Sequence, residues 1–115
     1  MIKRNGSLPI DVVTNRFGGN GEVKFTRIIE KEDFQGKGRL FAITSIEPGC
    51  SLGLHTHTGE MEAYYILRGQ GTVNDNGAET VVGPGDVVLT KDGESHAIAN
   101  TGDTTLELVA LILFS

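Results

Sequence analysis

The sequence predicts an all-β domain, built as a β-sandwich or a closed β-barrel. Glycine accounts for 16 of the 115 residues and proline for only 3. Many short strands joined by tight turns use glycine in this way, because such turns need residues with a positive φ. Short apolar and β-branched runs recur at regular spacing between turn signals, and no long stretch has the period of a helix. Closure into a barrel would point alternate residues of every strand into one small interior.

The composition bounds the class of protein. A chain of 115 residues forms one domain, and 38% hydrophobic with 22% charged residues is ordinary for a soluble globular protein. The net charge of −5, with no basic stripe, argues against a nucleic-acid or anionic-membrane partner. A single cysteine, Cys50, cannot form an internal disulfide, and no apolar run approaches the length of a signal or membrane segment. We therefore expect a cytoplasmic protein.

The first half of the chain contains an arm and three predicted strands. Residues 1–22 are expected to form an N-terminal arm, because Ile2–Val13 shows no clear period and Arg16–Gly21 is a loop by composition. Such an arm often packs on a partner subunit. The strands are predicted at Val23–Ile29, at Leu40–Ile46 before a Pro-Gly turn, and from near Cys50 through His57, with a charged connection over residues 30–38 that has room for one helical turn.

The second half predicts six more strands. They are Met61–Leu67, Thr72–Asn74, Glu79–Val82, Asp86–Leu89, Ser95–Asn100 and Thr105 to about Phe114. Asp75-Asn76-Gly77 is a strong hairpin signal, because Asn-Gly readily adopts the left-handed conformation of tight hairpins. The last strand is almost wholly apolar, which predicts a central or interfacial position.

The three histidines of the chain predict a metal site. His55 and His57 lie two apart, so in a strand both imidazoles point to the same face. Glu62 follows a flexible Thr-Gly pair, and His96 lies in a second patterned stretch. A lone His-x-His is a weak signal, but all three histidines fall beside glycine-rich turns. Histidine with a carboxylate is a common ligand set for transition metals. Glu60 shares the strand parity of Glu62 and is the alternative fourth ligand.

Two stretches resemble the motifs of the cupin superfamily. The first motif is Gly, five residues, His-x-His, three or four residues, Glu, six residues, Gly, and the positions Gly49, His55, His57, Glu62 and Gly69 satisfy every interval. The second is Gly, five residues, Pro-x-Gly, two residues, His, three residues, Asn, and it is matched by Gly85, Gly93, His96 and Asn100, with Lys91 at the proline position. The resemblance implies a small jelly-roll antiparallel β-barrel spanning residues 1–115, of the single-domain bacterial type called cupin-2.

Several short cupins of this type carry labels that resemble oxalate decarboxylase. In the two-domain oxalate decarboxylases a basic residue just upstream of the first histidine helps to hold the substrate carboxylate. Residues 51–54 of this chain, Ser-Leu-Gly-Leu, carry no charge, and no lid loop with a general acid is recognisable. The sequence therefore gives oxalate chemistry little support.

The expected function is that of a metal-binding cupin. One divalent transition metal per chain is expected at His55, His57, Glu62 and His96, and the ligand set suits Mn, Fe, Zn, Ni or Cu. The resemblance to cupins implies Mn or Fe as first guesses. An open metal site suits an enzyme that decarboxylates, isomerises or oxygenates a small carboxylate, sugar acid or related oxygenated metabolite. The alternative is a non-catalytic, metal-dependent module that binds or senses a small molecule, since fold does not decide between the two. Candidate pocket-lining residues are Glu60, Tyr64, Ile66 and Ile98.

Apolar residues on the outward faces of two predicted strands indicate self-association. Tyr65 and Leu67 lie on one strand, and Val109, Leu111 and Leu113 on another. One small barrel does not need so many apolar residues outside its core, so we expect a homodimer that buries sheet faces between subunits.

Overall fold

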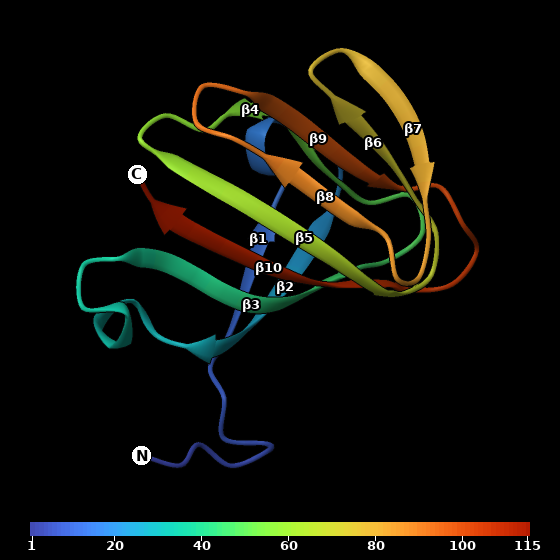
Figure 1. Ribbon diagram of the computed structural model, residues 1–115. Helices are drawn as coiled ribbons and strands as arrows, with labels where there is room; N and C mark the ends of the chain where they lie inside the picture. The colour runs from blue at the N-terminus through green and yellow to red at the C-terminus, as the bar shows by residue number, and fades with distance from the viewer.

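The computed structural model describes all of residues 1–115 and contains ten β-strands and two short 3-10 helices (Figure 1). The strands are β1 (Ile10–Thr14), β2 (Glu22–Ile29), β3 (Gly38–Ile46), β4 (Ser51–Thr56), β5 (Glu60–Arg68), β6 (Gly71–Asp75), β7 (Ala78–Val82), β8 (Val87–Thr90), β9 (Ser95–Asn100) and β10 (Leu106–Phe114). The helices are η1 (Arg16–Gly18), between β1 and β2, and η2 (Lys31–Phe34), between β2 and β3. Neither helix is long enough to cross a membrane.

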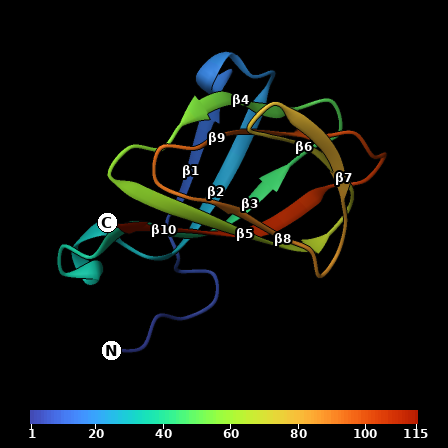
Figure 2. The ribbon, with the colours of Figure 1, turned by 45° about the horizontal axis from the view of Figure 1, so that its top comes forward.

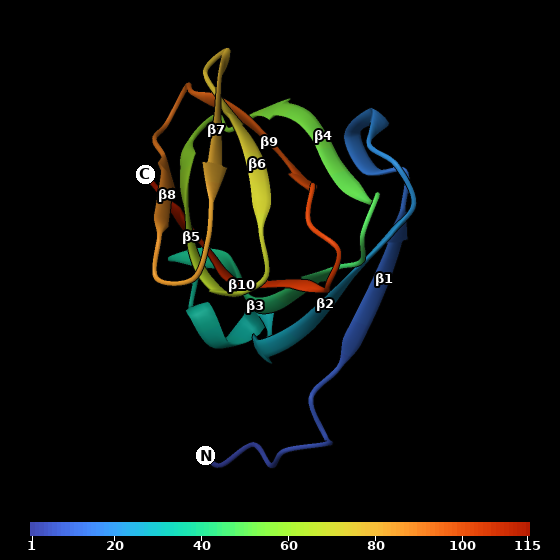
Figure 3. The same ribbon diagram turned by 90° about the vertical axis from the view of Figure 1, so that its right-hand side faces the viewer.

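The strands form two antiparallel sheets that face each other around a common interior. One sheet has six strands in the order β1-β2-β3-β10-β5-β8, and the other has four in the order β4-β9-β6-β7. Figure 3 shows the strands of both sheets arranged as a ring, and the tilted view in Figure 2 shows the two layers. The predicted all-β class and jelly-roll barrel are confirmed by this arrangement.

The buried face of the strands changes from polar to aliphatic along their length. On β5 the buried residues run from Glu60 and Glu62 to Tyr64 and Ile66, and on β9 His96 is followed by Ile98. Burying a large aliphatic side chain contributes roughly 1.5–3 kcal/mol, so the aliphatic end stabilises the barrel. The polar end, with Glu60, Glu62 and His96, is available to form a functional site.

The strands predicted after residue 22 are all present, with boundaries within two residues of those expected. The N-terminal stretch differs from the expected arm, because Ile10–Thr14 forms β1 and pairs antiparallel with β2. Its alternation is inverted: Ile10 and Val12 are exposed, whereas Asp11 lines the interior and forms an ion pair with Arg27. Because the Asp11 carboxylate faces inward, β1 lacks the alternation of inward apolar and outward polar residues by which a strand is predicted. Only residues 1–9 precede the first strand.

A β-bulge in β3 redirects one charged side chain. The pairing of β3 with β10 passes from Leu40–Ile112 to Gly38–Leu113, so Arg39 has no partner on β10. An extra residue of this kind breaks the alternation of a strand, and bulges often lie beside functional sites. Arg39 and Leu40 consequently both line the interior, although they are neighbours in the sequence.

Candidate metal centre

The four predicted ligands come together from both sheets. His55 on β4 lies directly opposite His96 on β9, His57 immediately follows β4, and Glu62 projects from β5 in the other sheet. One ligand atom from each of the four residues lies within 4.8 Å of all the others. His57, Glu62 and His96 are buried, and His55 is half-buried.

The distances within this group fit a single metal ion. The Nε2 atom of His96 lies 3.0 Å from the Nε2 atoms of both His55 and His57. Glu62 Oε1 lies 3.0 Å from the Nε2 atoms of His57 and His96. Two ligand atoms bonded to one metal at about 2.1 Å, and at right angles to each other, lie about 3.0 Å apart.

Hydrogen bonds at the Nδ1 atoms orient all three imidazoles. His55 Nδ1–H donates to the carbonyl oxygen of Gly53 at 2.7 Å, and His57 Nδ1–H donates to a carboxylate oxygen of Glu60 at 2.6 Å. His96 Nδ1 lies 2.7 Å from the hydroxyl oxygen of Thr90. A proton on Nδ1 leaves the Nε2 lone pair free, and partners of this kind are usual behind metal-binding histidines. The Nε2 atoms all point toward the shared centre.

Glu60, the alternative fourth ligand, points away from the centre to Arg39. The guanidinium of Arg39 donates two hydrogen bonds to its carboxylate, at 2.8 and 2.7 Å. Hydrogen bonds from Arg39 and then from His57, acting against the effect of burial, together lower the pKa of Glu60 to about 2. Glu60 therefore orients His57, while Glu62 is the carboxylate at the centre.

The electrostatics keep Glu62 charged. In the metal-free protein burial raises the pKa of Glu62, but hydrogen bonds from the Nε2–H groups of His57 and His96, at the positions that a bound metal would take, outweigh it, so the pKa is lowered overall. Burial lowers the pKa of His55, which favours the neutral imidazole that a metal requires. Hydrogen bonds to Glu62 and Glu60 raise the pKa of His57, so a metal that binds there must displace a proton. The group thus offers three imidazole nitrogens and one anionic oxygen.

Lys91 takes the proline position of the second motif without loss of the turn. The backbone N–H of Lys91 donates to the Glu94 side chain at 2.8 Å, a bond that proline lacks the hydrogen to make. The N–H of Glu94 donates to the Lys91 carbonyl at 3.0 Å, and the N–H of Gly93 donates to the His57 carbonyl at 2.6 Å. The turn therefore holds His57 in place.

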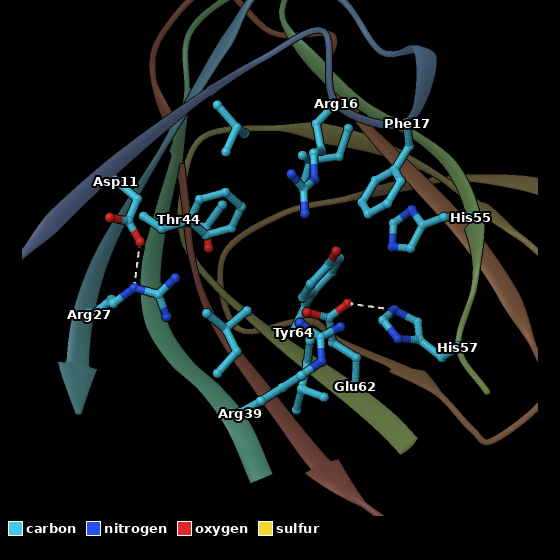
Figure 4. A pocket seen from close by; sticks show the side chains of 15 residues that line it. Asp11, Arg16, Phe17, Arg27, Arg39, Thr44, His55, His57, Glu62 and Tyr64 are labelled. Carbon is cyan, nitrogen blue, oxygen red and sulfur yellow. Dashed lines mark hydrogen bonds and ion pairs between the residues drawn. The ribbon is translucent and has the colours of Figure 1, made fainter. Parts of the chain in front are cut away.

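The centre opens on a cavity of about 270 Å³ (Figure 4). Of the candidate pocket residues, Tyr64 lines this cavity and stacks on His96, with ring centroids 5.0 Å apart. Ile66 and Ile98 share strand faces with the ligands but lie farther along the strands, in the aliphatic core. Glu60 is held behind His57.

Two residues of η1 belong to the site and were not predicted. Arg16 and Phe17 line the cavity, and Figure 4 shows both side chains above the histidines. The loop that carries them packs closely on β4: a Cβ atom added to Gly19 would overlap the backbone of residues 51–53. The Gly-Gly pair after Phe17 was a signal for such a close approach, but the sequence does not reveal its partner.

A two-sheet antiparallel barrel with a His₃Glu group at one end defines the class, and the chain belongs to the cupin family. Residues 42–112 match the family model described as the cupin domain. The predicted membership is therefore confirmed.

Particular relatives cover nearly the whole chain. An oxalate-binding protein of Thermotoga maritima is 45% identical over 113 residues, which cover 98% of this chain and 93% of that protein. A crystal structure described as a predicted oxalate decarboxylase from Thermotoga maritima is 44% identical, with a TM-score of 0.94 over all of both chains. The polyketide cyclase RemF from Streptomyces resistomycificus has a TM-score of 0.79 at 20% identity, covering 99% of this chain and 80% of that one, which shows the shared fold alone.

Proposed function

We propose that this protein binds a small carboxylate anion, with oxalate as the first candidate, at a divalent metal ion held by His55, His57, Glu62 and His96. The observation that carries the proposal is the placement of the His₃Glu group on a cavity that also receives an unpaired cation, Arg16. The similarity to a protein named for oxalate binding supports the same ligand class.

Arg16 differs from the other cations of the cavity because no carboxylate neutralises it. Arg27 is paired with Asp11, and Arg39 is paired with Glu60. Arg16 makes no ion pair, and its guanidinium lies 5.1 Å from the centre of the Phe17 ring. It supplies the positive charge that residues 51–54 lack, from an element far earlier in the chain. A carboxylate in the cavity would gain a charge-assisted hydrogen bond from it.

The chain's own residues prepare the site for an anion. Gly53, Glu60 and Thr90 hold the imidazoles so that their Nε2 atoms converge. A divalent cation bound there supplies positive charge and open coordination positions for ligand oxygens. The ligand set suits Mn, Fe, Zn, Ni and Cu, and membership of the cupin family makes Mn and Fe the first candidates.

Calorimetry with oxalate tests the proposal. Manganese-loaded protein should bind oxalate, chelator-treated protein should not, and Arg16→Gln should weaken binding about tenfold, since a charge-assisted hydrogen bond contributes roughly 1.5–3 kcal/mol. Arg4→Gln makes the same change of charge on the N-terminal segment and should bind as the wild type does. Oxalate binding that survives both metal removal and Arg16→Gln would contradict the proposal.

An enzyme is the second candidate, because the structure at 44% identity is described as a predicted oxalate decarboxylase. In that reaction the oxalate monoanion would lose CO₂ and give formate. Formate and CO₂ released in equal amounts by metal-loaded protein, and lost in Glu62→Gln, would establish catalysis. Metal-dependent oxalate binding without either product would leave a binding module.

We also propose that two copies of the chain associate through the outer face of the six-stranded sheet. Tyr65 on β5 is 49% exposed, and Val87 and Leu89 on the neighbouring β8 are 63% and 42% exposed. Contiguous apolar surface of this kind is characteristic of interfaces. A symmetric pair would cover the same patch on both copies.

A further inference from the structure

The cavity extends from the metal centre to the inner face of β1, β2 and β3. Figure 4 shows His55 and His57 on one side and the Asp11–Arg27 pair on the other, with Arg16 between them. The proposed binding of a carboxylate at the metal leaves this far side without a role.

Thr44 on β3 brings an unsatisfied polar atom to the far side. Its side chain is 0% exposed, and its Oγ1 is the one buried side-chain nitrogen or oxygen in the protein that has no hydrogen-bond partner. Leaving a buried hydroxyl unpaired costs about 1–3 kcal/mol, so such an atom calls for a reason. Thr44 belongs to the cavity wall but its Oγ1 is closed to water, so a polar ligand atom would satisfy it after a small shift of the neighbouring side chains.

Arg27 on β2 lies beside Thr44 on the same inner face. Arg27 pairs with Ala42 on β3, so Thr44, two residues farther along, is its diagonal neighbour. The Nε–H of Arg27 donates to Asp11, which fixes the guanidinium, while its two terminal NH₂ groups make no hydrogen bond in the protein. A guanidinium held in this way presents donors that match the two oxygens of a carboxylate.

The charges around the cavity suit an anion that carries two negative charges. Asp11 balances Arg27, and Glu60 balances Arg39. With Glu62 set against a divalent cation, one positive charge remains at the metal and a second on Arg16. A dianion, whether oxalate or a longer diacid, would neutralise both.

The cavity is also larger than oxalate requires. Its volume of about 270 Å³ approaches the roughly 300 Å³ at which pockets begin to hold drug-sized ligands. Oxalate has only six non-hydrogen atoms, and both of its carboxylates would be used at the metal. The far side, beside Arg27, would then hold only water.

From these observations we infer a second subsite, formed by Arg27 and Thr44, that binds the distal carboxylate of a dicarboxylic acid longer than oxalate. The head of this ligand, a hydroxy- or oxo-carboxylate, would chelate the metal, so the inference rests on the proposed function. The tail would receive hydrogen bonds from the guanidinium of Arg27 and from the Thr44 hydroxyl. Arg27 and Thr44 would thus determine which acid is preferred.

Binding of acids with the same head and different tails tests the inference. Lactate and malate share an α-hydroxycarboxylate head, but only malate and its homologue with one more methylene carry a distal carboxylate. Titration calorimetry on manganese-loaded protein should show at least one of these two acids binding about tenfold more tightly than lactate, since hydrogen bonds to charged groups contribute roughly 1.5–3 kcal/mol.

Two variants distinguish binding at the Arg27–Thr44 subsite from a general electrostatic attraction of diacids to the cavity. Thr44→Val keeps the shape of the side chain and removes only the unpaired hydroxyl, so the free protein should be at least as stable as the wild type. It should weaken binding of the preferred diacid about fivefold and leave lactate unchanged. Asp11→Asn combined with Arg27→Gln keeps the net charge and should abolish the preference over lactate. Thr26→Val, on the other face of β2, is the matched control and should change neither affinity.

The outcomes distinguish the two proposals. Metal-dependent binding of oxalate and lactate, with no gain for either diacid, would overturn the second subsite and leave the proposed function standing. An equal effect of Thr44→Val on lactate and on the diacid would also overturn the subsite. No binding of oxalate, lactate or either diacid to metal-loaded protein would overturn the proposed function itself, and the subsite with it.

Discussion

Phe17 stacks on His55, with ring centroids 4.0 Å apart and ring planes inclined by 18°. His55 is the least buried of the four candidate ligands, and its only hydrogen bond away from the centre runs to the Gly53 carbonyl. Phe17 therefore limits the rotation of an imidazole that little else restrains. Helix η1 thus positions a candidate metal ligand, although it lies outside both cupin motifs.

Phe17→Ala should weaken metal binding about tenfold, because the loss of groups that orient a ligand typically costs between tenfold and a hundredfold in affinity. Competition against a metal-binding dye measures the affinity. Phe17→Tyr keeps the stack and should restore it. Equal affinities of the alanine variant and the wild type would show that Phe17 does not position His55.

His96→Ala should remove bound metal and leave a folded β protein. His96 is fully buried, lies opposite His55 and stacks on Tyr64, so its loss leaves Thr90 without a partner and costs about 1–3 kcal/mol. Elemental analysis should show about one metal per chain in wild-type protein purified without chelator or affinity nickel, and little in the variant. His57→Ala should behave in the same way. Full metal content in either variant would refute this ligand set.

The strands could be predicted because their ends are marked by local chemistry. Pro48-Gly49 and Asn76-Gly77 define turns whatever the rest of the fold does. β1 has no such local mark, since Asp11 faces inward only because Arg27, on the neighbouring strand, pairs with it. A strand whose pattern depends on a partner across the sheet is not visible in its own sequence.

The metal centre could be predicted because its ligands follow local sequence spacing. The residues that surround it could not. Parity places His55 with His57 and leaves Glu60 and Glu62 equivalent. The motif spacing favours Glu62, but the role of Glu60 depends on Arg39, which reaches Glu60 from a bulge in β3 that no sequence pattern reveals. Arg16 reaches the cavity only because the turn between β1 and β2 folds back over β4.

Glu60→Gln should destabilise the metal-free protein in a pH-dependent way. The pKa of Glu60 is about 2 in the folded protein, chiefly because of Arg39, and about 4.3 in an unfolded chain. Because the folded pKa is the lower one, the stabilisation is fully present above about pH 4.3 and is lost as the pH falls toward 2. Arg39 is partly exposed to water, so we expect a loss of about 1–2 kcal/mol at pH 7.

Urea unfolding of chelator-treated protein at neutral and acid pH measures this difference. The gap between wild type and Glu60→Gln should narrow between about pH 4.3 and pH 2, where Glu60 takes up its proton, whereas protonation of His57 at higher pH strengthens its pair with Glu60. Glu79→Gln, which changes a carboxylate with no ion pair, is the control. A gap of the same size at every pH would mean that the Arg39–Glu60 pair does not stabilise the fold through its charge.

Sedimentation should show a dimer at micromolar concentration, if the outer face of the six-stranded sheet is the interface. Tyr65 lies opposite Val109 on the central strand β10, so Tyr65→Glu places a charge within this apolar face and should yield monomers. Val81→Glu alters a residue that is 62% exposed on the other sheet and should leave the dimer intact. A wild-type monomer at this concentration would contradict the proposal.

Gly53→Ala should loosen η1 and the metal centre together. A Cβ atom at residue 53 would overlap the Phe17 carbonyl oxygen and lie 2.8 Å from the Gly19 nitrogen, so the loop that carries Arg16 and Phe17 must move away from β4. Overpacking of this kind costs about 1–3 kcal/mol, and the movement would also disturb the Phe17–His55 stack. Gly83→Ala meets no neighbouring atom and is the matched control. Thermal unfolding and dye competition should both separate the two variants, whereas equal stability and equal metal affinity would show that η1 is not held by its close approach to β4.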